Sequence, residues 1–204
     1  MPGHDIIVIG ASAGGVEALT ELVGGLPPDL PAAVFVAVHV PADSRSALPD
    51  ILSRSGPLPA AHAQDGEAIQ QGRIYVAPPG RHLLVEQAVL RLSLAAQEHH
   101  TRPAADPLFR SAARAYGSRV VGVVLSGTLD DGTAGLIEIS RLGGASIAQE
   151  PADALFPTMP RNAIARGHVQ YILPPSAIAT VLTELAWAAS PLLRRTECEK
   201  DVRA

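Results

Sequence analysis

The sequence predicts an α/β fold in which helices cover both faces of a doubly wound, mostly parallel sheet. Apolar runs of strand type alternate along the chain with segments of helical type. The runs at 5–10, 32–40 and 118–127 are apolar almost throughout, as expected for strands that are covered on both faces. The 204 residues are 47% hydrophobic, so the chain can bury one full-sized core.

The remaining elements follow this alternation in order along the chain. A Gly-rich turn and a helix over 15–23 follow the first strand. A short strand over 73–80 ends at prolines, and the segment 82–93 is expected to form a β-hairpin at the edge of the sheet. Further along, we predict a polar loop over 97–106, helices over 107–117, 134–142, 159–167 and 174–190, and strands over 118–127, 143–150 and 168–173.

Composition excludes several classes of protein. The net charge of −4 argues against a general nucleic-acid binder, and no apolar stretch approaches the roughly 20 residues that span a bilayer. The single cysteine, Cys198, excludes a disulfide framework and fits a reducing compartment. Because the N-terminus shows no signal peptide, we expect a cytoplasmic protein without nucleic-acid partners or membrane insertion. Residues 1–192 are expected to form one domain, and 193–204 a charged C-terminal tail.

The first turn, residues 10–15 (GASAGG), carries the candidate nucleophile. It matches the G-x-S-x-G pattern between a predicted strand and a predicted helix, which is the context of a nucleophile elbow. Ser12 could then attack a carbonyl carbon, with the Ala13 N–H holding the oxyanion at the helix N-terminus. A Gly-rich first turn also cradles phosphates, although the dinucleotide fingerprint requires glycine where Ser12 stands. The turn alone favours neither interpretation.

Two further residues at strand ends favour catalysis. His39 closes the second strand, and Asp131 follows the strand over 118–127. Because the carboxyl ends of parallel strands meet at one edge of a sheet, both are expected on the same rim as Ser12. The Asp130–Asp131 pair also suits helix capping, so one aspartate is expected to cap the next helix while the other holds the histidine tautomer. A Ser-His-Asp triad of Ser12, His39 and Asp131 is therefore predicted.

The other histidines show no spacing typical of metal ligands, and no cofactor or metal is expected. They stand at positions 4, 62, 82, 99, 100 and 168. His99 and His100 are adjacent, so they cannot share one helix face, and we interpret them as a surface pair.

The sequence resembles the catalytic domain of CheB-type chemoreceptor methylesterases. The motifs that carry this resemblance occur in family order: IGASAGG (9–15), VHVP (38–41), IYVAPPGRH (74–82), RPAADPLFRSAA (102–113), GVVLSGTLDDGTAGL (122–136), AQEPADALFPTMPRNAI (148–164) and an IL-P-IA pattern at 172–179. The resemblance implies a Ser-His-Asp triad at Ser12, His39 and Asp131. It also implies hydrolysis of glutamate γ-methyl esters on the cytoplasmic helices of methylated chemoreceptors, and deamidation of receptor glutamines.

The chain departs from the family pattern at three places. Ala13 replaces a threonine that is usual in the first turn, which keeps the backbone donor but loses a hydroxyl. Thr128-Leu129 replaces Met-Gly in the loop expected to supply a second oxyanion amide, that of Thr128. The family commonly carries an N-terminal receiver domain that covers the active-site face until it is phosphorylated. This sequence begins at the first catalytic strand, so we expect a stand-alone domain, with a separate regulatory protein as a further candidate partner.

Several alternatives remain open at this stage. Arginines 73, 81, 102 and 110 are candidates for docking acidic receptor helices, with ordinary surface charge as the alternative. The chain could be a stand-alone esterase-like module of another signalling system, or a non-catalytic domain that binds a phosphate or a partner.

Overall fold

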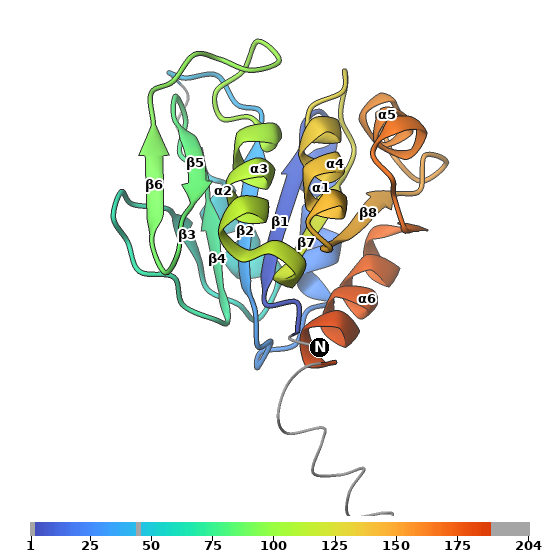
Figure 1. Cartoon of the computed structure of the whole chain (residues 1–204), viewed down its shortest axis with the longest axis horizontal. Coiled ribbons are helices and arrows are strands. Elements are labelled where there is room, and N and C mark those ends of the chain that lie inside the picture. Colours follow the sequence, from blue (N-terminus) through green and yellow to red (C-terminus); the bar gives the residue numbers. More distant parts are fainter. Residues whose placement is uncertain (1–2, 44–45, 189–204) are drawn as a thin grey trace, which may run out of the picture.

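A seven-stranded parallel sheet forms the centre of the fold (Figure 1). The computed structural model of the chain describes residues 3–43 and 46–188, so the expected tail over 193–204 lies outside the described residues. The strand order is β3-β4-β2-β1-β7-β8-β9, and all neighbours pair in parallel. The strands are β1 (Ile6–Ala11), β2 (Ala33–Val38), β3 (Ala60–His62), β4 (Arg73–Val76), β7 (Val120–Val124), β8 (Ala145–Gln149) and β9 (Tyr171–Leu173).

Helices cover both faces of this sheet because side chains alternate along each buried strand. Ile7 and Ile9 of β1 share one apolar cluster with α1 (Gly15–Gly24), α2 (Leu48–Ser55) and α6 (Pro175–Trp187). Ile6 and Val8 share the opposite cluster with α3 (Ala105–Tyr116), α4 (Thr133–Arg141) and α5 (Thr158–Arg166). The predicted doubly wound α/β fold is therefore confirmed, and the two clusters explain why the central strands are apolar throughout.

The predicted hairpin consists of β5 (His82–Val85) and β6 (Leu90–Ser93), which pair in antiparallel fashion. Instead of pairing with an edge strand, it forms a separate two-stranded sheet beside α3. Leu83, Val85 and Leu90 are buried in the same cluster as α3, so the hairpin covers a face of the fold rather than extending the sheet.

Three elements were not predicted from the sequence. Helix α2 and strand β3 lie between β2 and β4, and β3 forms the actual edge of the sheet. A 3-10 turn, η1 (Gly117–Arg119), links α3 to β7. In the described residues, no helix is both long enough and apolar enough to cross a membrane.

The order of the strands places a topological switch point at the carboxyl ends of β1 and β7. These strands are neighbours, but the helices that follow them, α1 and α4, cover opposite faces. Ligands of doubly wound folds bind at such a switch point. Gly10 lets α3 begin against the end of β1, because a Cβ at this position would lie 2.5 Å from the Ala105 Cβ. The N-terminus of α3 therefore lies beside this switch point.

Candidate active site

The turn that follows β1 holds Ser12 by backbone hydrogen bonds on both sides. The Ser12 N–H donates to the Ser126 carbonyl (2.9 Å), and the Ser12 carbonyl accepts from the Gly15 N–H (2.9 Å). The Ser126 hydroxyl donates to the Ala13 carbonyl (2.8 Å). Gly14 has a φ of +67°, and a Cβ there would lie 2.9 Å from the Ser126 Oγ, so the turn requires glycine at this position. Ser126 therefore clamps the turn that presents Ser12.

His39 directly follows β2, the strand that neighbours β1, and so lies beside the Ser12 turn. Ala11 pairs with Val38, so Ser12 and His39 follow at the next register position. The His39 N–H donates to the Ala11 carbonyl (3.3 Å). The His39 Nε2 lies 2.6 Å from the Asp131 Oδ2, and the side chain of His39 is only 11% exposed. The structure therefore brings His39 and Asp131 into direct contact beside the Ser12 turn.

Asp131 is fully buried and accepts four hydrogen bonds. Its Oδ2 accepts from His39 and from the Ala105 N–H (2.6 Å), and its Oδ1 accepts from the Asp106 and Gly132 N–H groups (both 2.9 Å). Burial alone would raise the pKa of the Asp131 carboxyl. The hydrogen bonds from His39, Ala105 and Asp106 outweigh burial and leave this pKa below its usual value. Asp131 is therefore held as a carboxylate.

The contact with Asp131 determines which nitrogen of His39 can act as a base. A carboxylate can only accept hydrogen bonds, so the His39 Nε2 carries a proton and its N–H donates a hydrogen bond to Asp131. The Nδ1 then keeps its lone pair and is the nitrogen that can accept the proton of Ser12. Among the described residues, no hydrogen bond joins the Ser12 hydroxyl to His39. Catalytic hydrogen bonds are often long without substrate and shorten in the substrate complex.

Two backbone amides close to Ser12 in the chain or in space have no protein acceptor. In the parts of the chain that the structure describes, neither the Ala13 N–H nor the Thr128 N–H donates to a protein atom. The loop that carries Thr128 lies close to the serine, because a Cβ on Gly127 would be 2.8 Å from the Ser12 Cβ. Asn162 donates to the Leu129 carbonyl (2.7 Å), which fixes this loop to α5.

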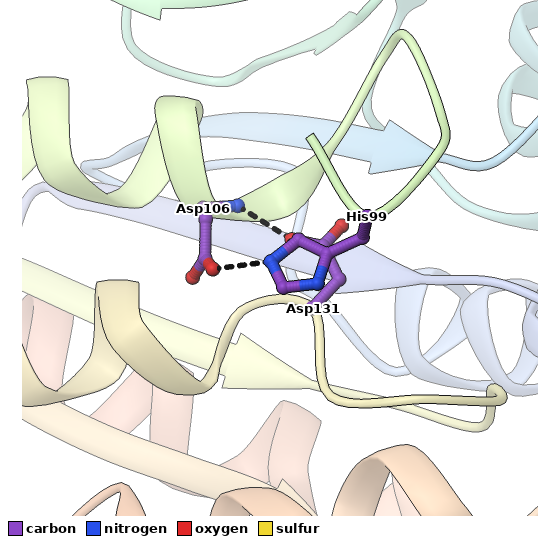
Figure 2. Close-up of side chains that lie close together, drawn as sticks. All are labelled: His99, Asp106 and Asp131. Carbon is purple, nitrogen blue, oxygen red and sulfur yellow. Dashed lines mark hydrogen bonds and ion pairs between the residues drawn. The ribbon is translucent and has the colours of Figure 1, made fainter. Parts of the chain in front are cut away.

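The prediction that His99 and His100 form a surface pair is wrong, because only His100 is exposed, whereas the half-buried His99 ring contacts buried carboxylates. Figure 2 shows one nitrogen of the His99 ring directed at the Asp106 carboxylate, with Asp131 next to the ring. The His99 Nε2 lies 2.8 Å from the Asp106 Oδ2 and 3.6 Å from the Asp131 Oδ1. The ligand atoms of these three residues lie within 4.8 Å of one another, a spacing that metal sites also show, although none was expected from the sequence. The cause is the turn at 98–101, which directs the ring inward.

Asp130 does not cap α4 with its side chain as expected. The N-cap of this helix is Gly132, and no side chain caps it. The Asp130 Oδ1 instead lies 3.2 Å from the His99 Nδ1. The Asp130 carbonyl accepts from the Thr133 N–H (3.2 Å), so Asp130 contributes to the start of α4 through its backbone only.

Sequence reasoning missed several residues that build the site. Ser126 clamps the nucleophile turn, and its own N–H is held by the Gln149 side chain (2.8 Å). Asp106 at the start of α3 accepts from the Gly135 N–H (2.7 Å) and so ties α3 to α4. The signal for Asp106 was its position directly before the predicted helix over 107–117, and the helix in fact begins two residues earlier, at Ala105. For Ser126, no signal is visible beyond its place at a strand end.

A cavity of about 320 Å³ adjoins His39 on the side of the 97–102 loop. Gln97, His100, Thr101 and Arg102 line it together with His39 and residues 40–42. Arg102 donates to the Leu94 and Ala95 carbonyls (2.9 and 2.8 Å).

Two of the other arginines considered for docking bind carboxylates of this chain. Arg110 pairs with Glu98 at 2.7 Å, and Arg73 pairs with Glu67 at 3.2 Å. Arg81 is exposed. Most of these arginines therefore already serve the fold, which weakens the expectation that they dock a receptor.

Comparison with known proteins supports a single family. The family described as CheB methylesterase matches residues 7–182. A protein-glutamate methylesterase/protein-glutamine glutaminase of Anaeromyxobacter dehalogenans is 40% identical over 181 residues, which cover 89% of this chain and 53% of the relative. A Leptospira interrogans protein, whose assigned name proposes the same two activities, is 34% identical, and the match covers 95% of its length.

The solved structures agree with this assignment. The crystal structure of the Thermotoga maritima CheB methylesterase catalytic domain superposes with a TM-score of 0.85 at 31% identity, covering 91% of this chain and 99% of that domain. The chain spans about half the length of the Anaeromyxobacter relatives that it matches. The matched residues include the Ser12 turn, the His39–Asp131 pair and the amides around them, so the chain belongs to the CheB methylesterase family.

Proposed function

We propose that this chain is a serine hydrolase that removes γ-methyl esters from protein glutamates, with Ser12 as nucleophile, His39 as base and Asp131 as the group that orients the base. One observation carries the proposal: the 2.6 Å contact between His39 and a fully buried Asp131, directly beside the Ser12 turn. This pairing fixes the histidine tautomer that a serine nucleophile requires. Membership of the CheB methylesterase family supports the choice of substrate.

The first half of the reaction forms an ester on Ser12. The His39 Nδ1 takes the hydroxyl proton as the Ser12 oxygen attacks the γ-carbonyl carbon of the substrate. The Ala13 and Thr128 N–H groups donate to the oxyanion that forms, and one such donor contributes about 10²–10³ in rate. When the intermediate collapses, the bond to the methoxy oxygen breaks and His39 gives its proton to the departing methanol.

The second half of the reaction releases the glutamate. His39 accepts a proton from water as the water oxygen attacks the Ser12 ester, and the same amides hold the second oxyanion. The Ser12–acyl bond then breaks and Ser12 regains its proton. If the substrate is a glutamine, ammonia leaves in place of methanol and the remaining steps are identical. We therefore propose that the site also deamidates glutamines.

The proposed substrates are the cytoplasmic helices of methylated chemoreceptors, which would place the protein in the cytoplasm. Three large apolar side chains are exposed near Ser12: Leu129 (52%), Leu155 (68%) and Phe156 (40%). Leu155 contacts the nucleophile turn, since a Cβ on Gly14 would lie 2.8 Å from the Leu155 Cβ. Such side chains suit contact with a protein surface rather than with a small polar molecule.

Methanol release from a methylated receptor tests this proposal. We expect Ser12→Ala to abolish release, because no hydroxyl remains to form the ester. Ser176→Ala, a change of an exposed serine at the start of α6, serves as the matched control and should retain full activity. Methanol release by Ser12→Ala at the rate of the unaltered chain would refute the nucleophile assignment.

Two alternatives predict different results in the same experiments. An esterase of another signalling system would react with a fluorophosphonate at Ser12 but release no methanol from chemoreceptors. A non-catalytic module would not react with the fluorophosphonate and would bind a phosphate-bearing ligand in calorimetry. Because the Ser12 turn is followed by a helix N-terminus, nucleotides are the appropriate ligands for that second measurement.

A further inference from the structure

Two buried carboxylates meet beside the proposed triad. The side chain of Asp106 is 2% exposed and that of Asp131 is 0% exposed. The Asp106 N–H donates to the Asp131 Oδ1, so the two residues share one small polar region between α3 and the loop that precedes α4. Two negative charges on buried carboxylates this close together repel each other, and one of them takes up a proton unless a cation compensates. Asp131 can orient His39 as proposed only in its ionised form.

His99 supplies the compensating charge. Its Nε2 lies 2.8 Å from Asp106 (Figure 2) and 3.6 Å from Asp131. Its Nδ1 lies 3.2 Å from Asp130. Carboxylate oxygens therefore face both ring nitrogens. A neutral imidazole carries a proton on only one nitrogen and would turn its lone pair toward a carboxylate on the other side. The geometry fits the imidazolium form, which donates on both sides.

The backbone holds His99 in this position at a conformational cost. His99 and His100 have φ values of +51° and +63°, and the Thr101 N–H donates to the Glu98 carbonyl (2.9 Å). Positive φ at both central residues is the pattern of a type I′ turn, which asparagine and glycine favour and histidine adopts less readily. Glu98 is anchored by Arg110 on α3. The turn is thus anchored at Glu98, and its central residue His99 is directed inward.

We propose that protonated His99 is a positioning residue of this site: it holds Asp106 and Asp131 as a pair of ionised carboxylates and thereby keeps Asp131 able to orient His39. The inference rests on the proposed function, in which Asp131 fixes the His39 tautomer. His99 acts only through Asp131. Hydrogen bonding to Asp106 and the charges of Asp131, Asp106 and Asp130 outweigh burial and raise the pKa of His99. Burial and the charge of Asp131 raise the pKa of Asp106, so Asp106 is the carboxyl group of the pair that most needs the compensating charge.

A bound metal ion is the other chemistry that His99, Asp106 and Asp131 could support, and the hydrogen bonds argue against it. A carboxylate offers about four lone-pair positions. Four donors already approach Asp131: His39 and the N–H groups of Ala105, Asp106 and Gly132. A metal ion would have to displace one of them, whereas a protonated histidine fits the contacts as they stand.

The pH dependence of fluorophosphonate labelling at Ser12 tests the proposal. Labelling requires an ionised Asp131 to orient His39, so its rate falls below an acidic midpoint. In His99→Asn the compensating charge is gone, so the carboxylate pair binds a proton more tightly. This moves the midpoint upward, by about one pH unit. Asparagine suits the left-handed backbone at this position, so the variant is expected to fold.

A double variant separates charge compensation from a structural role. His99→Asn combined with Asp106→Asn removes one positive and one negative charge, so the net charge beside Asp131 equals that of the unaltered chain. We expect the midpoint to return toward its original value. His168→Asn is the matched control, because His168 is an exposed histidine with a φ of +54° that lies outside the site. This change should leave the midpoint where it was.

The outcomes of these measurements distinguish the proposed role of His99 from a metal site and from a failure of the esterase proposal. An unshifted midpoint in His99→Asn, or a shift that Asp106→Asn fails to reverse, would overturn the inference while the esterase proposal stands. If EDTA lowers labelling of the unaltered chain and Zn²⁺ restores it, the cluster holds a metal and the inference is wrong. If the unaltered chain does not react at Ser12 at all, the proposed function fails and the inference fails with it.

Discussion

Replacing Asp131 by asparagine tests how the buried carboxylate controls His39. Asparagine has nearly the same shape, but it keeps only one acceptor oxygen and places an NH₂ group where the other oxygen was. If the oxygen remains on the Asp106 and Gly132 amides, the NH₂ group faces the Ala105 N–H and the His39 Nε2, which both lie 2.6 Å from the present Oδ2. The NH₂ group can then only donate to His39, so the proton of the imidazole moves to Nδ1 and the base for Ser12 is lost.

The sizes of the expected losses in kcat and in folding free energy follow from these contacts. Inverting the histidine tautomer in a serine triad lowers kcat about 10⁴-fold. Leaving the buried Ala105 N–H without an acceptor costs about 1–3 kcal/mol of folding free energy. We therefore expect Asp131→Asn to fold, to unfold at lower denaturant concentration and to lose nearly all methanol release. Asp29→Asn is the matched control, because Asp29 is exposed and lies ahead of β2, at the opposite end of this strand from His39. This change should alter neither the denaturant concentration of unfolding nor methanol release.

The loss of stability in Asp131→Asn is expected to depend on pH. The pKa of Asp131 is lowered in the folded chain, so its contribution to stability is present above the unfolded value of 3.8 and is lost as the pH falls through the folded value. The difference in unfolding free energy between the unaltered chain and Asp131→Asn should therefore shrink as the solution is acidified. A variant that keeps substantial activity, or a stability difference that grows in acid, would refute the reasoning about this carboxylate.

Three further predictions concern residues around the triad. Ser126→Ala removes the hydroxyl that clamps the nucleophile turn, and denaturant unfolding should show a loss of about 1–3 kcal/mol together with slower labelling of Ser12. Gly127→Ala would place a Cβ 2.8 Å from the Ser12 Cβ, and we expect methanol release to fall about 10²-fold because the nucleophile is displaced; normal turnover would contradict the close approach. The pKa of His99 is raised in the folded chain, so the stability that His99 contributes is complete below the unfolded pKa of 6.5 and is lost as the pH rises through the folded pKa. Thermal unfolding should therefore show a larger destabilisation by His99→Asn in mild acid than in mild alkali.

The apolar pattern was sufficient to predict the layers of the fold. The strands over 5–10, 32–40 and 118–127 appear as β1, β2 and β7 at the centre of the sheet, where burial on both faces leaves an uninterrupted apolar run. Strand β3 was missed because its three residues are only half buried at the sheet edge, so they carry no such run. The position of the hairpin depends on packing against α3, a tertiary contact that local sequence does not encode.

Part of the site could be predicted from the rule that parallel strands end at one edge of a sheet. Because strands end at a common rim, Ser12, His39 and Asp131 could be expected there from their positions after three strands, and the contact of His39 with Asp131 agrees with this expectation. The inward direction of His99 could not be predicted, because it arises from the positive φ values of a turn anchored by Glu98. Asp106 was obscured for a similar reason: its partners, Asp131 and Gly135, come from distant segments of the chain.

Fluorophosphonate labelling followed by peptide mass spectrometry tests the central claim most directly. We expect the probe to attach to one residue, Ser12, and attachment to become very slow in His39→Ala and Asp131→Asn while the chain remains folded. Labelling at a different serine, or labelling of Ser12 at an unchanged rate without His39, would contradict the proposed triad.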